Sequence, residues 1–128
     1  MKASTPVRLK RAYEPPSDTD GLRILVDRLW PRGLTKDAAK IDVWLKDVAP
    51  SPPLRTWFGH DPAKWDEFRK RYEAELSERL DAVAELCRLL SEGPATLVYA
   101  AKDSAHTHAL VLMHVLRHER RSPRPRGR

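Results

Sequence analysis

Short apolar runs of strand length recur along the chain and are separated by polar turns. Residues 22–26 and 96–101 are mostly apolar, which predicts two buried strands in the interior of a sheet. Residues 7–12 predict a first strand at a sheet edge, closed by a turn-rich segment with prolines. The alternation of side chains over residues 41–45 predicts a third, half-buried strand.

Most of the sequence between these strands has the periodicity of helices. Residues 61–90 predict one long helix, because Asp61 is a good N-cap and Pro62 suits the first turn. Apolar residues then recur in steps of three and four and form a single stripe that ends before residues 93–94. Short helices are expected near residues 36–40 and 54–58. A terminal helix is expected over residues 106–117.

A helix between two apolar strands implies a parallel, right-handed crossover, so the order of elements predicts an α/β fold. We expect a single domain over residues 1–118, with helices packed on a small, mostly parallel sheet in a Rossmann-like three-layer arrangement. A length of 128 residues suits one such domain. The sequence contains no nucleophile elbow, no P-loop and no dinucleotide-binding glycine fingerprint.

Charged residues follow both buried strands directly. Asp27 and Arg28 come after the first of them, and Lys102 and Asp103 come after the second. In open α/β sheets, ligands bind just beyond the carboxyl ends of the strands. If the two strands are parallel, these four side chains meet along one edge of the sheet, where we expect the functional site.

The basic residues at these strand ends predict an anion-binding pocket. Arg28 and Arg32 offer planar donors that suit phosphate or carboxylate, and Lys102 adds a third charge. The start of the terminal helix would add free backbone N–H groups. Trp30 either stacks on a planar ligand or forms a lid over the strand end. The structural alternative is that Arg28 pairs with one of the neighbouring aspartates and only closes the sheet edge.

Two histidines near the second strand end are candidates for acid–base chemistry, since their ordinary pKa lies near 6.5. His106 or His108 would act as general acid or base, with Asp27 or Asp103 orienting it. The alternative is a helix cap or a surface histidine. The H-x-H spacing also invites a metal, but residues two apart on a helix diverge, so no metal site is expected. His60 is expected to be an ordinary loop residue.

The positive charge of the chain is concentrated at its C-terminal end. The net charge is +6, and residues 120–128 hold five arginines and no acids, which leaves +1 for the rest. The segment 119–128 is rich in proline and arginine, so we expect it to be a disordered tail. Such a tail either keeps the protein soluble or contacts a nucleic acid.

Cysteine content and hydropathy predict the compartment. Cys87 is the single cysteine, which excludes an intrachain disulfide and suits a reducing environment. The start of the chain has no apolar core typical of a signal peptide, and no apolar run approaches the length of about 20 residues that spans a bilayer. We therefore expect a cytoplasmic protein that does not enter membranes.

Two sequence stretches carry a resemblance to a known family. Residues 26–33 read VDRLWPRG, and residues 100–109 read AAKD-x-x-H-x-H-A. Together with the segments around Trp44 and Trp57, these stretches resemble the YeaO-like family of small bacterial proteins over residues 7–117. The family is a domain of unknown function, so the resemblance implies no particular reaction or cofactor. Larger, looser relatives have a cysteine in the loop after the late strand, whereas this chain has Lys102 and Asp103 there.

The hypothesis that combines these observations is a cytoplasmic protein with an anion-binding pocket at the strand ends. It would act as an enzyme on a small molecule with a phosphate or carboxylate group, through acid–base chemistry of histidine and aspartate. The alternatives are a nucleic-acid-associated protein and a ligand-binding regulatory protein without catalysis. Salt-dependent binding favours the former alternative, and saturable binding without turnover favours the latter.

Overall fold

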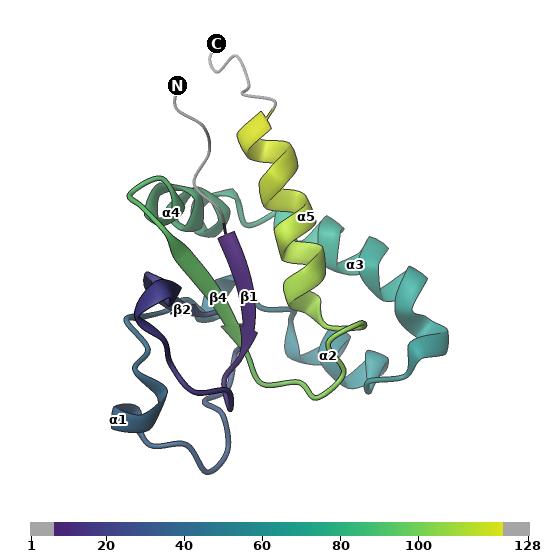
Figure 1. The fold of residues 1–128 in the computed structure, drawn as a ribbon. Coiled ribbons are helices and arrows are strands. Elements are labelled where there is room, and N and C mark those ends of the chain that lie inside the picture. Colours follow the sequence, from purple (N-terminus) through teal and green to yellow (C-terminus); the bar gives the residue numbers. More distant parts are fainter. Residues whose placement is uncertain (1–6, 122–128) are drawn as a thin grey trace.

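A parallel four-stranded sheet forms the centre of the computed structural model, which describes residues 7–121 (Figure 1). The strands are β1 (Val7–Arg11), β2 (Leu22–Leu25), β3 (Val43–Trp44) and β4 (Ala95–Tyr99). Their spatial order is β1-β4-β2-β3, and every neighbouring pair is parallel. The predicted α/β fold is therefore confirmed, with the two apolar strands in the middle of the sheet and β1 at an edge.

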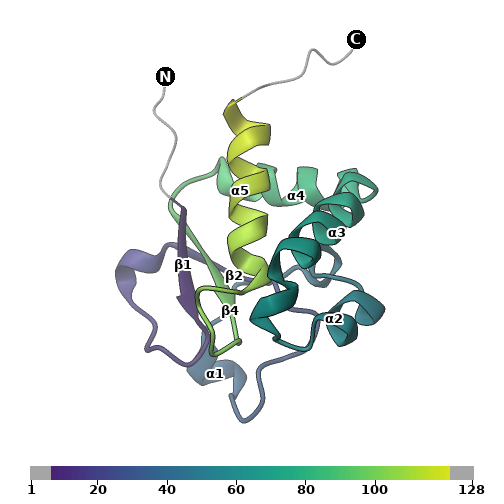
Figure 2. The same ribbon diagram turned by 90° about the vertical axis from the view of Figure 1, so that its right-hand side faces the viewer.

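The longer helices pack together on one face of this sheet (Figure 2). The helices are α1 (Lys36–Ala39), α2 (Pro52–Phe58), α3 (Trp65–Ser77), α4 (Leu80–Leu90) and α5 (His108–Arg121). Residues of α2 to α5 share one apolar core with Ile24 and Leu97 of the central strands, which are both fully buried. Among the described residues, no helix is both long enough and apolar enough to cross a membrane.

The opposite face of the sheet carries a thinner and more polar layer. It consists of loops, helix α1 and the short 3-10 turn η1 (Asp18–Asp20). Buried Arg23 of β2 donates to the carbonyl of Ala39 at the end of α1 and pairs with Asp20 at 2.7 Å. Lys10 pairs with the same carboxylate at 3.1 Å. The third layer of the expected arrangement is thus held by this buried ionic network and by a small apolar cluster around Leu25 and Val98, rather than by a long helix.

The single long helix predicted over residues 61–90 is wrong, because two helices meet there at an angle. A 3-10 turn, η3 (Pro62–Lys64), leads into α3, and the backbone leaves helical geometry at Arg79 before α4 begins. The Arg79 guanidinium donates to the carbonyls of Asp47 and Ala49. The break turns Leu80, which the stripe placed in the core, outward to 63% exposure.

Smaller differences concern the ends of elements. The short helices expected near residues 36–40 and 54–58 are present as α1 and α2. The terminal helix begins at His108, two residues later than expected, and extends to Arg121, past the expected domain boundary at residue 118. Residues 122–128, the remainder of the predicted tail, lie outside the described residues.

Candidate functional site

A cleft of about 640 Å³ opens at the carboxyl edge of the sheet. Segments that follow β1, β2 and β4 line it, together with the loop before α2, α2 itself and α3. The predicted site residues all lie along this cleft: Asp27, Arg28, Trp30, Arg32, Lys102, Asp103, His106 and His108. Parallel strands bring them together because their carboxyl ends share one edge of the sheet.

Asp27 joins the ends of the two central strands. Its Oδ2 accepts a hydrogen bond from the backbone N–H of Ala100 at 2.9 Å, just after β4. Its backbone carbonyl accepts from the indole N–H of Trp44 in β3 at 2.7 Å. The remaining oxygen, Oδ1, is buried and accepts no hydrogen bond from any described residue. A buried polar atom without a partner is unusual and marks this carboxylate as a functional candidate.

His108 is the titratable group that lies next to that oxygen. Its Nε2 lies 3.3 Å from Asp27 Oδ1 and 3.0 Å from the carbonyl oxygen of Val26. A carbonyl only accepts hydrogen bonds, so Nε2 carries the proton. Burial raises the pKa of Asp27 and lowers the pKa of His108, and the attraction between the two groups opposes both shifts. The neutral form of each group is therefore favoured more than in water.

His106 forms a second, more exposed histidine–aspartate pair. Asp103 accepts its Nδ1–H at 2.8 Å, and the same carboxylate caps the loop by accepting the backbone N–H groups of Ala105 and His106. These hydrogen bonds, the histidine one foremost, lower the pKa of Asp103. The ring edge of His106 also contacts Trp65 at a centroid distance of 5.4 Å. The two histidines thus pair with different aspartates, and they do not converge on one metal position.

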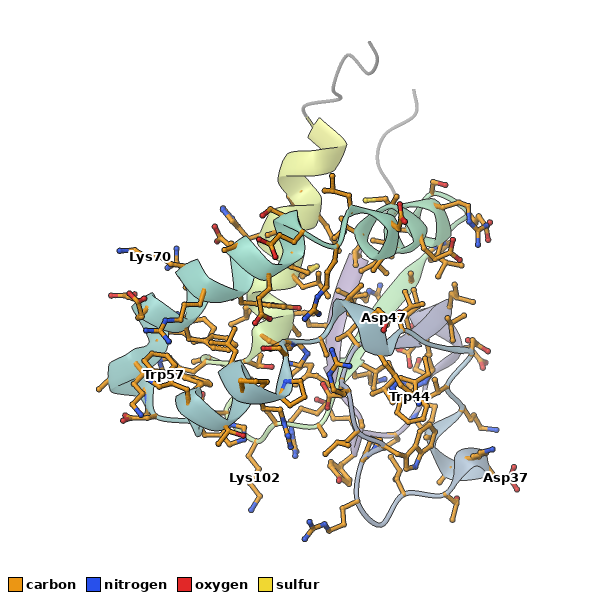
Figure 3. All side chains as sticks on the ribbon, turned by 180° about the vertical axis from the view of Figure 1, so that it is seen from behind. Asp37, Trp44, Asp47, Trp57, Lys70 and Lys102 are labelled. Carbon is orange, nitrogen blue, oxygen red and sulfur yellow. The ribbon has the colours of Figure 1, made fainter. Side chains whose placement is uncertain are left out.

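Arginine and lysine side chains line the same cleft as these two pairs. Arg28 reaches the carbonyls of Ala49 and Pro50 through long hydrogen bonds of 3.4 Å, and it forms no ion pair with Asp27 or Asp103. The expected structural alternative, in which Arg28 pairs with a neighbouring aspartate, is therefore not what the geometry shows. Lys102 is exposed and extends away from the ribbon at the lower edge of the molecule in Figure 3.

Two cleft residues lack a clear sequence signal. Arg55 lies on α2, which follows no strand directly, so strand-end reasoning does not find it. Its positive charge acts on both Asp27 and His108 across the cleft. His60 lies in a loop, as expected, but it also lines the cleft, and its backbone has a positive φ of 59°. No local sequence signal marks Arg55. The positive φ of His60 is a conformation typical of glycine, and it cannot be read from the sequence.

Trp30 is fixed in the wall of the cleft. Its indole N–H donates to the carbonyl of Leu34 at 2.6 Å, and its ring packs edge-on against Trp44 with centroids 5.5 Å apart. Tyr13 donates to the carbonyl of Arg32 at 2.8 Å and secures the other side of the same loop. Trp30 is thus part of the wall of the cleft and packs against Trp44 of β3.

Metal ligands do not gather in this cleft. Within residues 7–117, whose side chains are described, no group of three histidine, cysteine or acidic residues is placed to hold a metal ion. The charged and titratable side chains that line the cleft include its arginines, Lys102, His60 and the two histidine–aspartate pairs. Cys87, the single cysteine, lies on α4 and is not among the residues that line the cleft.

Comparison of the sequence with known proteins shows the family of this chain. A family model described as the inactive DUF488-N3 subclade matches residues 6–125. An uncharacterised protein of Mycobacterium tuberculosis H37Rv is 45% identical over 116 residues, which cover 91% of this chain and 98% of that protein. The uncharacterised protein YeaO of Escherichia coli K12 is 41% identical over 111 residues, which cover 87% and 96% of the two chains. No solved structure matches the chain. The chain therefore belongs to the YeaO-like DUF488 family, within the group described as its inactive N3 subclade.

Proposed function

We propose that the cleft binds a small molecule with a phosphate or carboxylate group and does not convert it. The observation that carries this proposal is that four cationic side chains, Arg28, Arg32, Arg55 and Lys102, line one cleft. None of the four forms an ion pair with an acid among the residues that the structure describes. Guanidinium groups without a carboxylate partner are suited to bind an incoming anion.

The acids of the cleft do not cancel this positive charge. Asp103 is occupied by His106, and Asp27 is held between the N–H of Ala100 and His108. The volume of about 640 Å³ lies within the range typical of small-molecule sites. The cleft also contains the N-terminal end of α5, whose backbone dipole favours negative charge. Charge, size and position thus all support a small anion as the occupant.

Binding without turnover is favoured by the description of the family model as inactive. The alternative with a structural observation of its own is acid–base catalysis. The His106 Nδ1–Asp103 distance of 2.8 Å is that of an oriented histidine, whose Nε2 remains the position for proton transfer. Catalysis and binding alone make opposite predictions for the fate of a bound ligand, so one experiment separates them.

The test is a titration of the protein with phosphate, sulfate, nucleotides and small carboxylates, followed by calorimetry and thermal unfolding. A ligand at about 100 times its Kd adds roughly 2.7 kcal/mol of stability, which raises Tm by several degrees. Arg55→Ala and Lys102→Ala are expected to weaken binding about tenfold, the scale of a lost charged hydrogen bond. The matched controls are Arg88→Ala on α4 and Lys70→Ala on α3, neither of which lines the cleft (Figure 3 labels Lys70).

Two results would overturn the proposal. The first is the absence of any stabilising anion, and the second is equal loss of binding in the cleft variants and their controls. The bound ligand is then followed by NMR over hours. An unchanged ligand supports binding alone, whereas conversion that His106→Gln abolishes would establish the catalytic alternative.

A further inference from the structure

An apolar rim borders the cleft next to its cationic residues. The large hydrophobic side chains that are exposed in the described part of the chain are Tyr13, Leu29, Leu80 and Leu110. Two of them, Tyr13 at 44% and Leu29 at 58% exposure, line the cleft. Isolated exposed leucines are common on protein surfaces, but two apolar side chains at the mouth of one charged cleft call for an explanation.

Leu29 is exposed between two residues whose side chains contact the body of the molecule. Arg28 is tied to the carbonyls of Ala49 and Pro50, and Trp30 is tied to the carbonyl of Leu34 and packed on Trp44. Between these two residues, Leu29 remains exposed.

Tyr13 is held at the same mouth by independent contacts. Its hydroxyl donates to the carbonyl of Arg32 at 2.8 Å, and the Arg11 guanidinium lies 5.3 Å from its ring centroid. Arg11 in turn donates to the carbonyls of Ala100 and Ala101, which follow β4. The ring is thus fixed against the strand ends and needs no rearrangement before it contacts a ligand, which lowers the entropy cost of binding.

From this juxtaposition we propose that Leu29 and Tyr13 form a subsite for an apolar group carried by the bound anion. The ligand class is an amphipathic anion, with an aromatic or branched hydrocarbon group attached to the phosphate or carboxylate. Arg28, Arg32 and Lys102 bind the charged end, and the apolar end covers Leu29. This inference rests on the proposed anion-binding function, and it adds that a bare inorganic ion fills only part of the site.

The experiment compares matched pairs of ligands by calorimetry: phenyl phosphate against inorganic phosphate, and benzoate against acetate. If a ligand pair binds, the wild type is expected to bind the aromatic member with a Kd about tenfold lower than that of its partner. Such a difference in affinity is expected when a ligand partly covers a leucine side chain. Leu29→Ser is expected to remove most of this preference and to leave the Kd of the inorganic or short ion unchanged. Leu29→Met, which keeps an apolar side chain, is expected to retain the preference.

Leu80→Ser is the matched control, because Leu80 on α4 is exposed to 63% and does not line the cleft. It is expected to bind all four ligands as the wild type does. Equal affinity for both members of a pair, or an unchanged preference in Leu29→Ser, would overturn the apolar subsite while anion binding stands. If no member of either pair binds, anion binding and the subsite fall together. Equal Tm values of the variants verify that each has folded.

Discussion

Asp27 connects three separate elements at the edge of the cleft. Its side chain bonds to the end of β4, its carbonyl bonds to Trp44 of β3, and its buried Oδ1 faces His108 at the start of α5. Burial of a carboxylate with one unsatisfied oxygen costs stability, and such a cost persists in proteins mainly where function requires it. The Asp27–His108 pair is therefore where stability and function are expected to conflict.

The lowered pKa of His108 predicts how stability depends on pH. As pH falls from about 7 to 5, an unfolded histidine with a pKa near 6.5 takes up a proton before the buried His108 does. The unfolded state then binds more protons, so the free energy of unfolding decreases, with a slope of at most about 1.4 kcal/mol per pH unit for one proton. Urea unfolding of His108→Gln over this range is expected to show a shallower decrease. Identical slopes in both proteins would contradict the prediction.

The raised pKa of Asp27 predicts a pH dependence of stability with the opposite sign, which Asp27→Asn tests. The pKa of Asp27 is raised by burial, so above 3.8 the unfolded carboxyl ionises first and the wild type loses stability as pH rises. The asparagine variant lacks this loss. Its stability relative to the wild type is therefore expected to increase as pH rises from about 4 upward, and a pH-independent difference would contradict that expectation.

At the scale of elements, the junction between α3 and α4 holds the loop that forms one wall of the cleft. Arg79 donates to the carbonyls of Asp47 and Ala49, and Tyr72 of α3 donates to the carbonyl of Val48. Glu75 accepts both the backbone N–H and the hydroxyl of Ser51. Helix α3 and the break after it thus hold the loop through two donors and one acceptor, and the same loop offers the carbonyls that Arg28 contacts.

Removal of the Arg79 side chain tests whether its contacts with the loop stabilise the protein. Arg79→Ala leaves two loop carbonyls without their charged donor and is expected to lower the free energy of unfolding by about 2 kcal/mol. Arg88→Ala removes an exposed arginine that pairs only with Glu85 and Glu92 of its own helix region. Its unfolding midpoint in urea is expected to stay close to that of the wild type. Equal midpoints for the two variants would show that the contacts of Arg79 with the loop are dispensable.

At the scale of the whole molecule, positive charge occurs in two separate places. Residues 1–119 have a net charge of only +1, yet four cationic side chains line the cleft. The remaining excess charge belongs to the five arginines of residues 120–128. The proposed binding of a small anion and the alternative of a nucleic-acid contact would therefore depend on different parts of the chain, and truncation tests them separately.

A chain that ends at Arg121 keeps the whole of α5 and lacks three of the C-terminal arginines. If these arginines contact nucleic acid, the truncation is expected to reduce the slope of log K against log salt concentration by about 2 to 3, nearly one for each lost phosphate contact. Binding of small anions is expected to stay unchanged. The measurement is fluorescence anisotropy of a labelled duplex at several salt concentrations. An unchanged slope would exclude a contribution of residues 122–128 to nucleic-acid binding.

Local sequence signals alone indicated the strands, the short helices and the edge of the sheet at which the cleft opens. The apolar runs predicted the two central strands, and the polar residues directly after them indicated where the strand ends meet. These predictions succeed because periodicity, capping and strand length depend on residues that are close neighbours in the chain. The eight predicted site residues line one cleft because parallel strands that are adjacent in a sheet bring their carboxyl ends together.

Only the tertiary structure decided which side chains meet across the cleft. The apolar stripe runs unbroken through Leu80, so nothing local announces the break that Arg79 makes by bonding to a distant loop. Arg55 enters the cleft because α2 packs beside the strand ends, and His108 meets Asp27 because α5 begins next to the end of β2. Such contacts join residues far apart in sequence, and they are fixed by how whole elements pack rather than by any pattern along the chain.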